Sequence, residues 1–333
     1  MVPQASAKAP VPRARPWREI LTAAERRALR TPSSWRGGLS LGLDWGLVAL
    51  ALALVASAPG PLLRGAALLL AVLVIGGRQL GLAVLMHEAA HYTLFRSRRL
   101  NDFAGRWLCA YPIWADLEPY RAYHFRHHAR NWTKDDPDLD LASKFPVAAA
   151  SLRRKIWRDL SGQVGWKRAR AILARDLAGA RTKSARGPGS AGWRNLRGVA
   201  VTNGLLVALL AAAGHPALYG VWVLAWLTTY SLATRIRSIA EHNMVPDPAD
   251  PLRNSRTTLA SWWERLLWAP NRVSYHLEHH LLMTVPFYHL PRMHRLLRER
   301  GALTGALVER GYLPLLRRAA AGRPARDSAA GLV

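Results

Sequence analysis

Residues 62–91 read LLRGAALLLAVLVIGGRQLGLAVLMHEAAH, a long apolar run that ends in a pair of histidines. At about 1.5 Å per residue in a helix, this run is long enough to cross a hydrocarbon layer of about 30 Å. A second apolar run, LSLGLDWGLVALALALVASA at residues 39–58, precedes it, and Pro59-Gly60-Pro61 lies between them. The two runs predict a helical hairpin that spans a membrane.

A second pair of apolar runs follows at residues 198–214 and 217–237, with His215-Pro216 between them. All four runs are apolar on every helix face, whereas buried helices of a large soluble bundle need amphipathic partners to cover them. We therefore predict an all-α integral membrane protein with four transmembrane helices arranged as two hairpins. The soluble bundle is the alternative.

The charge of the chain predicts its orientation. Its 333 residues carry 47 Lys and Arg against 21 Asp and Glu, a formal net charge of +26. The two short turns hold almost none of this charge, since Arg64 is the basic residue nearest to them. Because Lys and Arg accumulate on the cytoplasmic side of membrane proteins, we expect both termini and the central loop there, forming a helical cap. Without a nucleic-acid-binding motif, the charge predicts no nucleic-acid partner.

This topology divides the chain into a basic arm (1–38), a membrane domain (39–300) and a tail (301–333). Residues 143–197 form a cytoplasmic insertion within the membrane domain. Its basic residues alternate with tryptophans, which fits either an amphipathic helix on the membrane surface or a solvated insertion. The single cysteine, Cys109, excludes an internal disulfide, a CxxC redox pair and an iron–sulfur cluster built by this chain alone.

Most of the 12 histidines fall into three short clusters. Histidines spaced three and four residues apart project from one helix face and can converge on one metal ion. The predicted topology places all three clusters on the cytoplasmic side and His215 on the opposite side. Together with a single histidine after the last span, the candidate metal ligands are His87, His91, His124, His127, His128, His242, His276, His279 and His280.

Nine imidazoles exceed the three or four protein ligands of a zinc site and would serve two ions. Imidazole suits iron, copper and zinc alike, so the residues leave the element open. HEAAH matches the HExxH pattern of zinc proteases with Glu88 as general base, but that scheme gives the other clusters no role. We expect Glu88, Glu241 and Glu278 to accept ring N–H bonds and so to orient neighbouring imidazoles.

The order HxxxH, HxxHH and HxxHH around two membrane hairpins resembles the membrane-bound fatty acid desaturase and hydroxylase superfamily. The resemblance covers roughly residues 62–300, and stretches such as YHFRHHARNWTKDDPDLDL and YHLEHHLLMTVPFYHLPRMH read like bacterial members. It implies a non-haem centre of two iron ions held by the nine histidines, with O2 as co-substrate. It also implies a location in a bacterial inner membrane.

The resemblance implies that the chain introduces a double bond into a fatty acyl chain. Hydroxylation or ketolation of a lipid or carotenoid is the alternative within enzymes, because the ligands do not decide between these outcomes. A membrane protein that stores or passes metal ions is the alternative outside enzymes, and histidines confined to one end of the spans argue against transport. The chain lacks cysteine clusters, a flavin domain that bears GxGxxG and the haem motif HPGG, so we expect an external electron donor of the ferredoxin or cytochrome b5 type.

Two charged residues, Asp44 and Arg78, lie within the first predicted hairpin. A charge inside a span costs roughly 2.5 to 3.5 kcal/mol on insertion scales and usually faces a partner. Counted from the cytoplasmic ends, their depths differ by only about 6 Å at 1.5 Å per residue. We predict that they form an ion pair, with Gln79 as a further partner. The alternatives are that Arg78 lines a substrate tunnel, or that Asp44 lies unpaired among the head groups.

Overall fold

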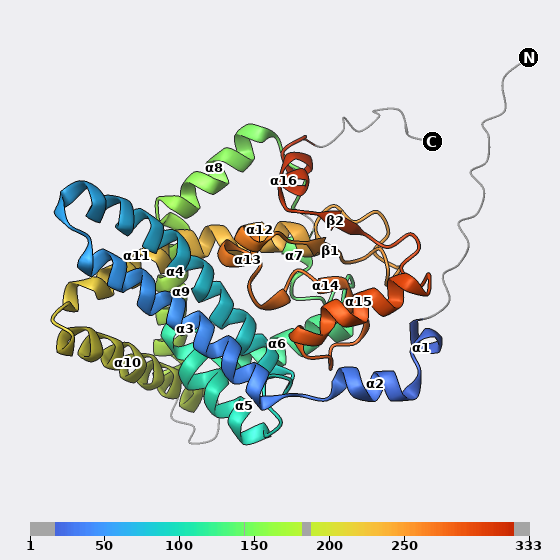
Figure 1. Cartoon of the computed structure of the whole chain (residues 1–333), viewed down its shortest axis with the longest axis horizontal. Helices are drawn as coiled ribbons and strands as arrows, with labels where there is room; N and C mark the ends of the chain where they lie inside the picture. Colours follow the sequence, from blue (N-terminus) through green and yellow to red (C-terminus); the bar gives the residue numbers. More distant parts are fainter. Residues whose placement is uncertain (1–16, 143, 182–187, 323–333) are drawn as a thin grey trace, which may run out of the picture.

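A computed structural model describes residues 17–142, 144–181 and 188–322 of the chain. Most of these residues are helical (Figure 1). The predicted basic arm, insertion and tail each lie partly outside the described residues. Only their described portions are placed in the fold.

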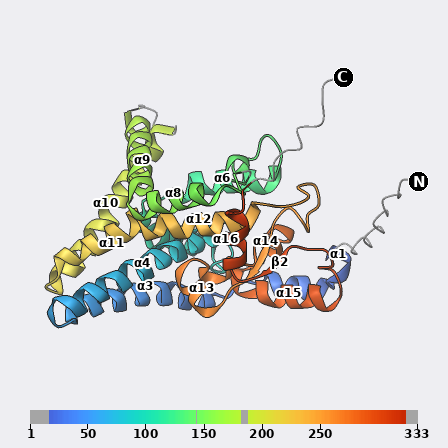
Figure 2. The ribbon, with the colours of Figure 1, turned by 90° about the horizontal axis from the view of Figure 1, so that it is seen from above.

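The first two predicted spans are two long helices that lie side by side, α3 (Ser34–Ser57) and α4 (Gly60–Ala90), as Figures 1 and 2 show. Pro59 precedes α4 and Pro61 occupies its first turn, where a missing backbone N–H costs nothing. In the most apolar stretch of α4, 67% of the residues are buried inside the protein. The corresponding share in α3 is only 28%. The exposed faces of α3 are apolar, which suits contact with lipid.

A third long apolar helix is α10 (Pro188–Ala212), so three helices in the described part of the chain are long and apolar enough to cross a membrane. The fourth predicted span does not form one helix. It is divided into the short helices η3 (Pro216–Leu218), α11 (Tyr219–Leu227) and α12 (Thr229–His242). Three of the four predicted spans are therefore single helices that could cross a membrane, and the fourth is not.

The break between α11 and α12 has a tertiary cause. Thr228 has φ −111° and ψ −86°, which no helix accommodates. The next residue, Thr229, donates from its hydroxyl to the carbonyl of Val72 on α4 at 2.5 Å. This approach needs Gly76 on α4, since a Cβ there would lie 2.1 Å from the Thr229 hydroxyl. The Thr229 hydroxyl thus holds α12 against α4 at the expense of a continuous helix.

The remaining elements are short, and two of them are strands. β1 (Thr257–Leu259) and β2 (Val308–Arg310) form a small parallel pair, which corrects the all-α prediction. The other helices are α1 (Trp17–Ile20), α2 (Ala23–Arg30), α5 (Arg98–Ala104), η1 (Gly105–Ala110), η2 (Tyr111–Ile113), α6 (Leu117–Arg130), α7 (Leu139–Ala142), α8 (Ala149–Leu160), α9 (Gln163–Arg181), α13 (Trp262–Leu267), η4 (Pro270–Arg272), α14 (His276–Leu281), η5 (Phe287–His289), α15 (Leu290–Glu299) and α16 (Leu313–Ala319).

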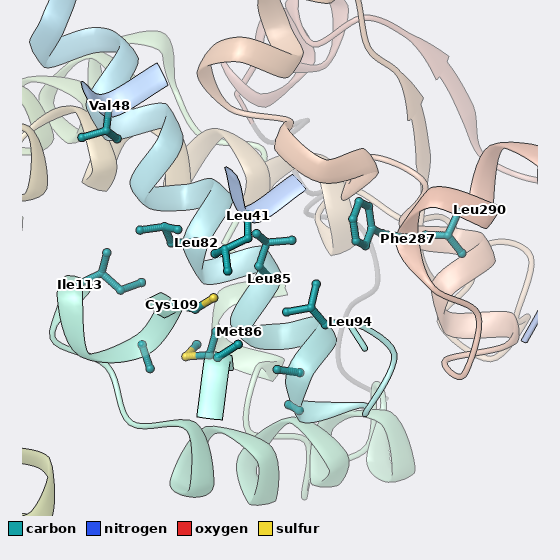
Figure 3. Packing of buried hydrophobic residues seen from close by; sticks show 14 of the residues in the cluster. Leu41, Val48, Leu82, Leu85, Met86, Leu94, Cys109, Ile113, Phe287 and Leu290 are labelled. Atoms are coloured by element: carbon teal, nitrogen blue, oxygen red, sulfur yellow. The ribbon is translucent and has the colours of Figure 1, made fainter. Parts of the chain in front are cut away.

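The core surrounds the second half of α4. Leu85 and Met86 of this helix belong to the same buried cluster as Cys109 of η1 and Phe287 of η5 (Figure 3). Segments from distant parts of the sequence therefore pack around the end of α4, where its histidines lie. Figures 1 and 2 also place the α3–α4 turn and the α10–η3 turn at one end of the molecule, with α14 and α15 toward the other.

Candidate metal centre

The nine candidate histidines come from four helices. His87 and His91 lie at the end of α4, and His242 is the last residue of α12. The other six lie on α6 and α14. Helix α6 is capped at its start by Asp116, whose carboxylate accepts a hydrogen bond from the backbone amide of Glu118 at 3.3 Å.

The structure brings the nine histidines together in two groups. Within each group, one nitrogen from every ring lies within 4.8 Å of the others. One group contains five residues, His87, His91, His124, His128 and His279, and the other contains four, His127, His242, His276 and His280.

The two HxxHH clusters are shared between the groups. In α6, His124 and His128 face one group while His127 faces the other, and in α14, His276 and His280 separate from His279 in the same way. At 3.6 residues per turn, adjacent residues differ by about 100° around the helix, so neighbouring histidines point to different groups. Residues four apart differ by only about 40° and face the same group.

Several ring nitrogens that face into the groups carry lone pairs. Nδ1 of His242 faces the carbonyl of Asn254 at 3.1 Å, so it must donate. Burial lowers the pKa of His242 to about 3 and that of His128 to about 2. Neutral rings therefore direct the unprotonated Nε2 of His242 into the site, as a metal ligand requires.

The spacing of the Nε2 atoms fits metal coordination. Nε2 of His128 lies 2.9 Å from Nε2 of both His124 and His279, and Nε2 of His242 lies 2.8 Å from that of His276. A metal–nitrogen bond of about 2.1 Å places two ligands at right angles about 3.0 Å apart. A single ring N–H cannot bridge three converging imidazoles, whereas a cation attracts all of their lone pairs. The donor set thus fits two metal ions with nitrogen ligands.

Two of the predicted carboxylates lie beside ligand histidines. Oε1 of Glu88 lies 3.3 Å from Nδ1 of His87, and its other oxygen accepts a hydrogen bond from the Thr93 hydroxyl at 2.7 Å. Oε1 of Glu241 lies 3.6 Å from Nδ1 of His276 and is held by the Arg237 guanidinium at 2.5 Å.

Glu278 has different partners from those that the sequence predicts. Its two oxygens accept hydrogen bonds from Nδ1 of His294 at 2.7 Å and from the Thr257 hydroxyl at 2.5 Å. Neither partner is a candidate ligand. Glu278 therefore ties α14 to α15 and β1, and it acts on the histidine cluster by fixing the helix that carries it.

Sequence reasoning missed Asp136, whose carboxylate accepts a hydrogen bond from Nδ1 of His127 at 2.8 Å. The backbone amides of Trp132 and Asp138 also donate to Asp136, each at 2.9 Å. This carboxylate orients a ligand imidazole in the way predicted for the glutamates. It lies in the loop segment DDPDLD, where the run of aspartates near the second cluster was the available signal.

The remaining predicted residues lie away from the two groups. His215 is exposed and lines an apolar cavity of about 540 Å³ between α3, α10 and α11. Asp44 and Arg78 lie 2.8 Å apart as an ion pair. Gln79 does not join that pair and donates instead to the carbonyl of Trp222 at 2.9 Å.

Comparison with known proteins agrees with this site. The model of the fatty acid desaturase family matches residues 59–310, which contain all nine histidines of the two groups. Dihydrorhizobitoxine desaturase of Bradyrhizobium elkanii is 26% identical over 243 residues, which are 68% of this chain and 66% of the relative. The match thus spans about two thirds of that relative's length. Since the family match extends over well more than half of this chain, the chain belongs to the fatty acid desaturase family.

Proposed function

We propose that the chain is a membrane-bound oxidoreductase that uses O2 to introduce a double bond into a fatty acyl chain. The observation that carries this proposal is the convergence of nine imidazoles in groups of five and four. A ligand set of this size exceeds a closed zinc site and suits two redox-active ions. The relative is named a desaturase of dihydrorhizobitoxine, so the test includes products other than fatty acids.

We further propose that iron occupies both groups. The chemistry that bound iron supplies is the reduction of O2 coupled to hydrogen removal from an unactivated carbon. The residues of the chain contribute orientation, because Asp136 accepts a hydrogen bond from Nδ1 of His127 and so fixes that ring. They also exclude water, since most of the ligand rings are buried.

The substrate is positioned by a cavity of about 180 Å³ that lies against four of the histidines. The hydroxyl-bearing residues Thr234 and Ser238 line it, as does Tyr120, whose ring stacks on His124 with 5.4 Å between centroids. The position of the substrate carbons relative to the metal site decides between two outcomes. Loss of a second hydrogen gives a double bond, and insertion of oxygen gives a hydroxyl group. Hydroxylation or ketolation of a lipid or carotenoid is therefore the alternative reaction.

Product analysis tests the reaction. The chain is expressed in bacteria that carry a ferredoxin and a cytochrome b5 with their reductases, and the extracted lipids are analysed by mass spectrometry. A new double bond in acyl chains, absent from cells that express His127→Ala at equal abundance, supports desaturation. New hydroxyl or keto groups establish the alternative reaction, and unchanged lipids together with unchanged soluble metabolites contradict enzymatic activity on these classes.

Metal analysis of the purified chain separates an enzyme from a protein that stores or passes metal ions. About two irons per chain, with nitrogen-dominated coordination in X-ray absorption spectra, is the expected result. Stoichiometric zinc without iron would contradict the di-iron proposal. Exchange of bound metal within minutes, without any product, would favour metal handling.

We propose that the histidine-bearing end faces the cytoplasm of a bacterial inner membrane. Support comes from the scarcity of basic residues at the two turns and their abundance elsewhere. The native Cys109 is buried, so cysteines introduced at exposed positions can be labelled selectively. A thiol reagent that cannot cross membranes should label Pro59→Cys but not Lys134→Cys in intact cells, and the reverse pattern would invert the orientation.

We also propose an external electron donor, a ferredoxin or a cytochrome b5-type protein, that docks through an acidic surface on the basic face of this chain. The proposal predicts that the purified protein turns over repeatedly only when such a donor and its reductase are added. The rate should fall as salt screens the docking charges. Repeated turnover with NADPH alone would contradict it.

A further inference from the structure

Helix α9 of the inserted segment covers a second cavity of about 320 Å³. Figure 2 shows α9 beside α10 and close to α11. Most of the lining is apolar and includes Ile113, Trp114 and Ile172, but Arg168 of α9 also lines the cavity. The cavity is therefore an apolar space with a cation in its wall.

The surroundings of Arg168 leave its charge without a counter-ion. One terminal nitrogen donates to the carbonyl of Trp226 at 2.7 Å, and the guanidinium lies 4.3 Å from the ring centre of Trp226 and 4.6 Å from that of Tyr230. Its Nε is buried and has no hydrogen-bond partner. In the part of the chain that the structure describes, Arg168 forms no ion pair with a carboxylate.

Two other shielded arginines have more partners in the protein. Arg235 on α12 is paired with Asp159 of α8, and buried Arg256 donates from both terminal nitrogens to the carbonyls of Ala240, Asn243 and Met244, although its Nε also has no partner. A desolvated cation with neither arrangement is costly, and stacking on aromatic rings offsets only part of the cost. The unused donors of Arg168 indicate an anionic ligand.

The carboxylate that shares this cavity is already engaged. Asp116 lines the same space, but one of its oxygens accepts the hydrogen bond that begins α6. Arg175, also in the lining, is paired with Asp176. Arg168 is therefore the lining cation that is free to bind a further anion.

The cavity adjoins the one that lies against the histidines. Met86, which precedes the ligand His87, lines it, as do Tyr120 and Tyr123. The two tyrosines also line the 180 Å³ cavity that lies against the histidines. The α9 cavity and the cavity at the metal site thus share a wall made by Tyr120 and Tyr123, with Arg168 on the α9 side.

We propose that Arg168 binds the anionic end, a carboxylate or a phosphate, of an amphipathic substrate whose hydrocarbon chain lies in the α9 cavity and extends past Tyr120 toward the histidines. This inference rests on the proposed function, because it names the substrate class of the same site. It assigns to the inserted helix α9 the recognition of the substrate's polar end.

Binding is measured without O2 or electrons, using radiolabelled dodecanoate, dodecyl phosphate and dodecanol with the purified chain in zwitterionic lipid nanodiscs, corrected with empty nanodiscs. The wild-type chain should bind at least one of the anions about tenfold or more tightly than dodecanol, because a hydrogen bond between two charged groups is stronger than one to a neutral hydroxyl. The preferred anion distinguishes a carboxylate from a phosphate.

Arg168→Gln should bring the affinity for the anion down to that for dodecanol, whose own affinity stays unchanged. Arg168→Lys keeps the charge and should keep most of the preference. The matched control is Arg170→Gln, which removes an exposed arginine two residues along the same helix and should change nothing. An anion preference that survives in Arg168→Gln, or that is also lost in Arg168→Lys while dodecanol still binds, overturns the proposal.

The result of the binding experiment is independent of the product analysis that tests the proposed function. A chain that binds the anion through Arg168 but forms no product keeps this inference and contradicts the reaction. A chain that desaturates lipids but binds dodecanoate, dodecyl phosphate and dodecanol equally keeps the reaction and contradicts this inference.

Discussion

Arg78 and Asp44 form a buried ion pair between α4 and α3, with Nη1 of Arg78 2.8 Å from Oδ1 of Asp44. The second oxygen of Asp44 accepts a hydrogen bond from the Asn271 amide at 2.8 Å, and Nη2 of Arg78 donates to the carbonyl of Arg265 at 2.7 Å. The pair therefore connects the first two membrane helices to α13 and to η4, which lies between α13 and α14. Since α14 carries three of the histidines, this connection fixes two ligand-bearing helices relative to each other.

We predict that Asp44→Asn and Arg78→Gln each destabilise the protein strongly. Removal of one partner leaves the other as an unpaired buried charge, which costs about 3–5 kcal/mol. The double variant should lose less than the sum of the two, with a coupling energy of about 0.5–3 kcal/mol. Thermal unfolding in detergent measures all three variants.

Arg64→Gln is the control for this cycle, because Arg64 lies exposed on the same helix and forms a single long hydrogen bond of 3.3 Å to the Ala58 carbonyl. It should unfold at the wild-type temperature. Additive losses in the double variant would show that the two residues act independently. A loss of activity in Arg78→Gln with unchanged stability would instead place Arg78 at a substrate path.

Gly81 of α4 is predicted to tolerate no side chain. A Cβ at this position would lie 2.6 Å from both carboxylate oxygens of Asp44, which Arg78 and Asn271 hold in place. We expect Gly81→Ala to cost about 1–3 kcal/mol through overpacking and loss of the pair. Gly65→Ala, on the same helix with no atom within 4 Å of its Cβ, should be neutral or stabilising because alanine favours helix. Equal unfolding temperatures for the two variants would contradict this account.

The parts of the fold that the sequence predicts are those set by local properties. Apolar length marks α3, α4 and α10, and counting the helical rise brings Asp44 and Arg78 to similar depths. The division of the fourth span depends on contact between Thr229 and Gly76, which lie far apart in the sequence. No local property of residues 217–237 predicts that contact.

The same distinction applies to the site. Spacing identifies eight of the nine histidines as candidates, because residues three and four apart share a helix face, and His242 is a single histidine that its position after the last predicted span adds. It does not reveal which histidines of the other helices join His127 and which join His128, since that depends on how the four helices pack together. Asp136 was missed for a related reason. It reaches His127 from a loop, where no helical period constrains its position.

Asp136→Asn is predicted to weaken metal binding while the fold stays intact. The amide can still accept a hydrogen bond from His127, but the carboxylate's charge that supports the ring as a ligand is lost. Loss of such a partner typically lowers metal affinity by about 10–100-fold. We expect the iron content after dialysis against a chelator to fall from about two toward one per chain.

The control for this change is Asp135→Asn, because Asp135 is adjacent and exposed. It removes the same charge from the same loop and should retain wild-type iron. Equal iron loss in both variants would mean that the general charge of the loop, rather than the bond to His127, governs metal affinity.

The last prediction compares a candidate ligand with a histidine outside the two groups. His127→Ala should remove a ligand of the four-membered group, and the expected result is loss of iron and of product formation in protein that still inserts into the membrane. His215→Ala should keep both, because His215 lies exposed beside the apolar cavity between α3, α10 and α11 and belongs to neither group. Iron content, product formation and membrane abundance are measured in parallel for both variants. Loss of iron in His215→Ala at normal abundance would show that the ligand set extends beyond the nine histidines, and full iron in His127→Ala would remove His127 from it.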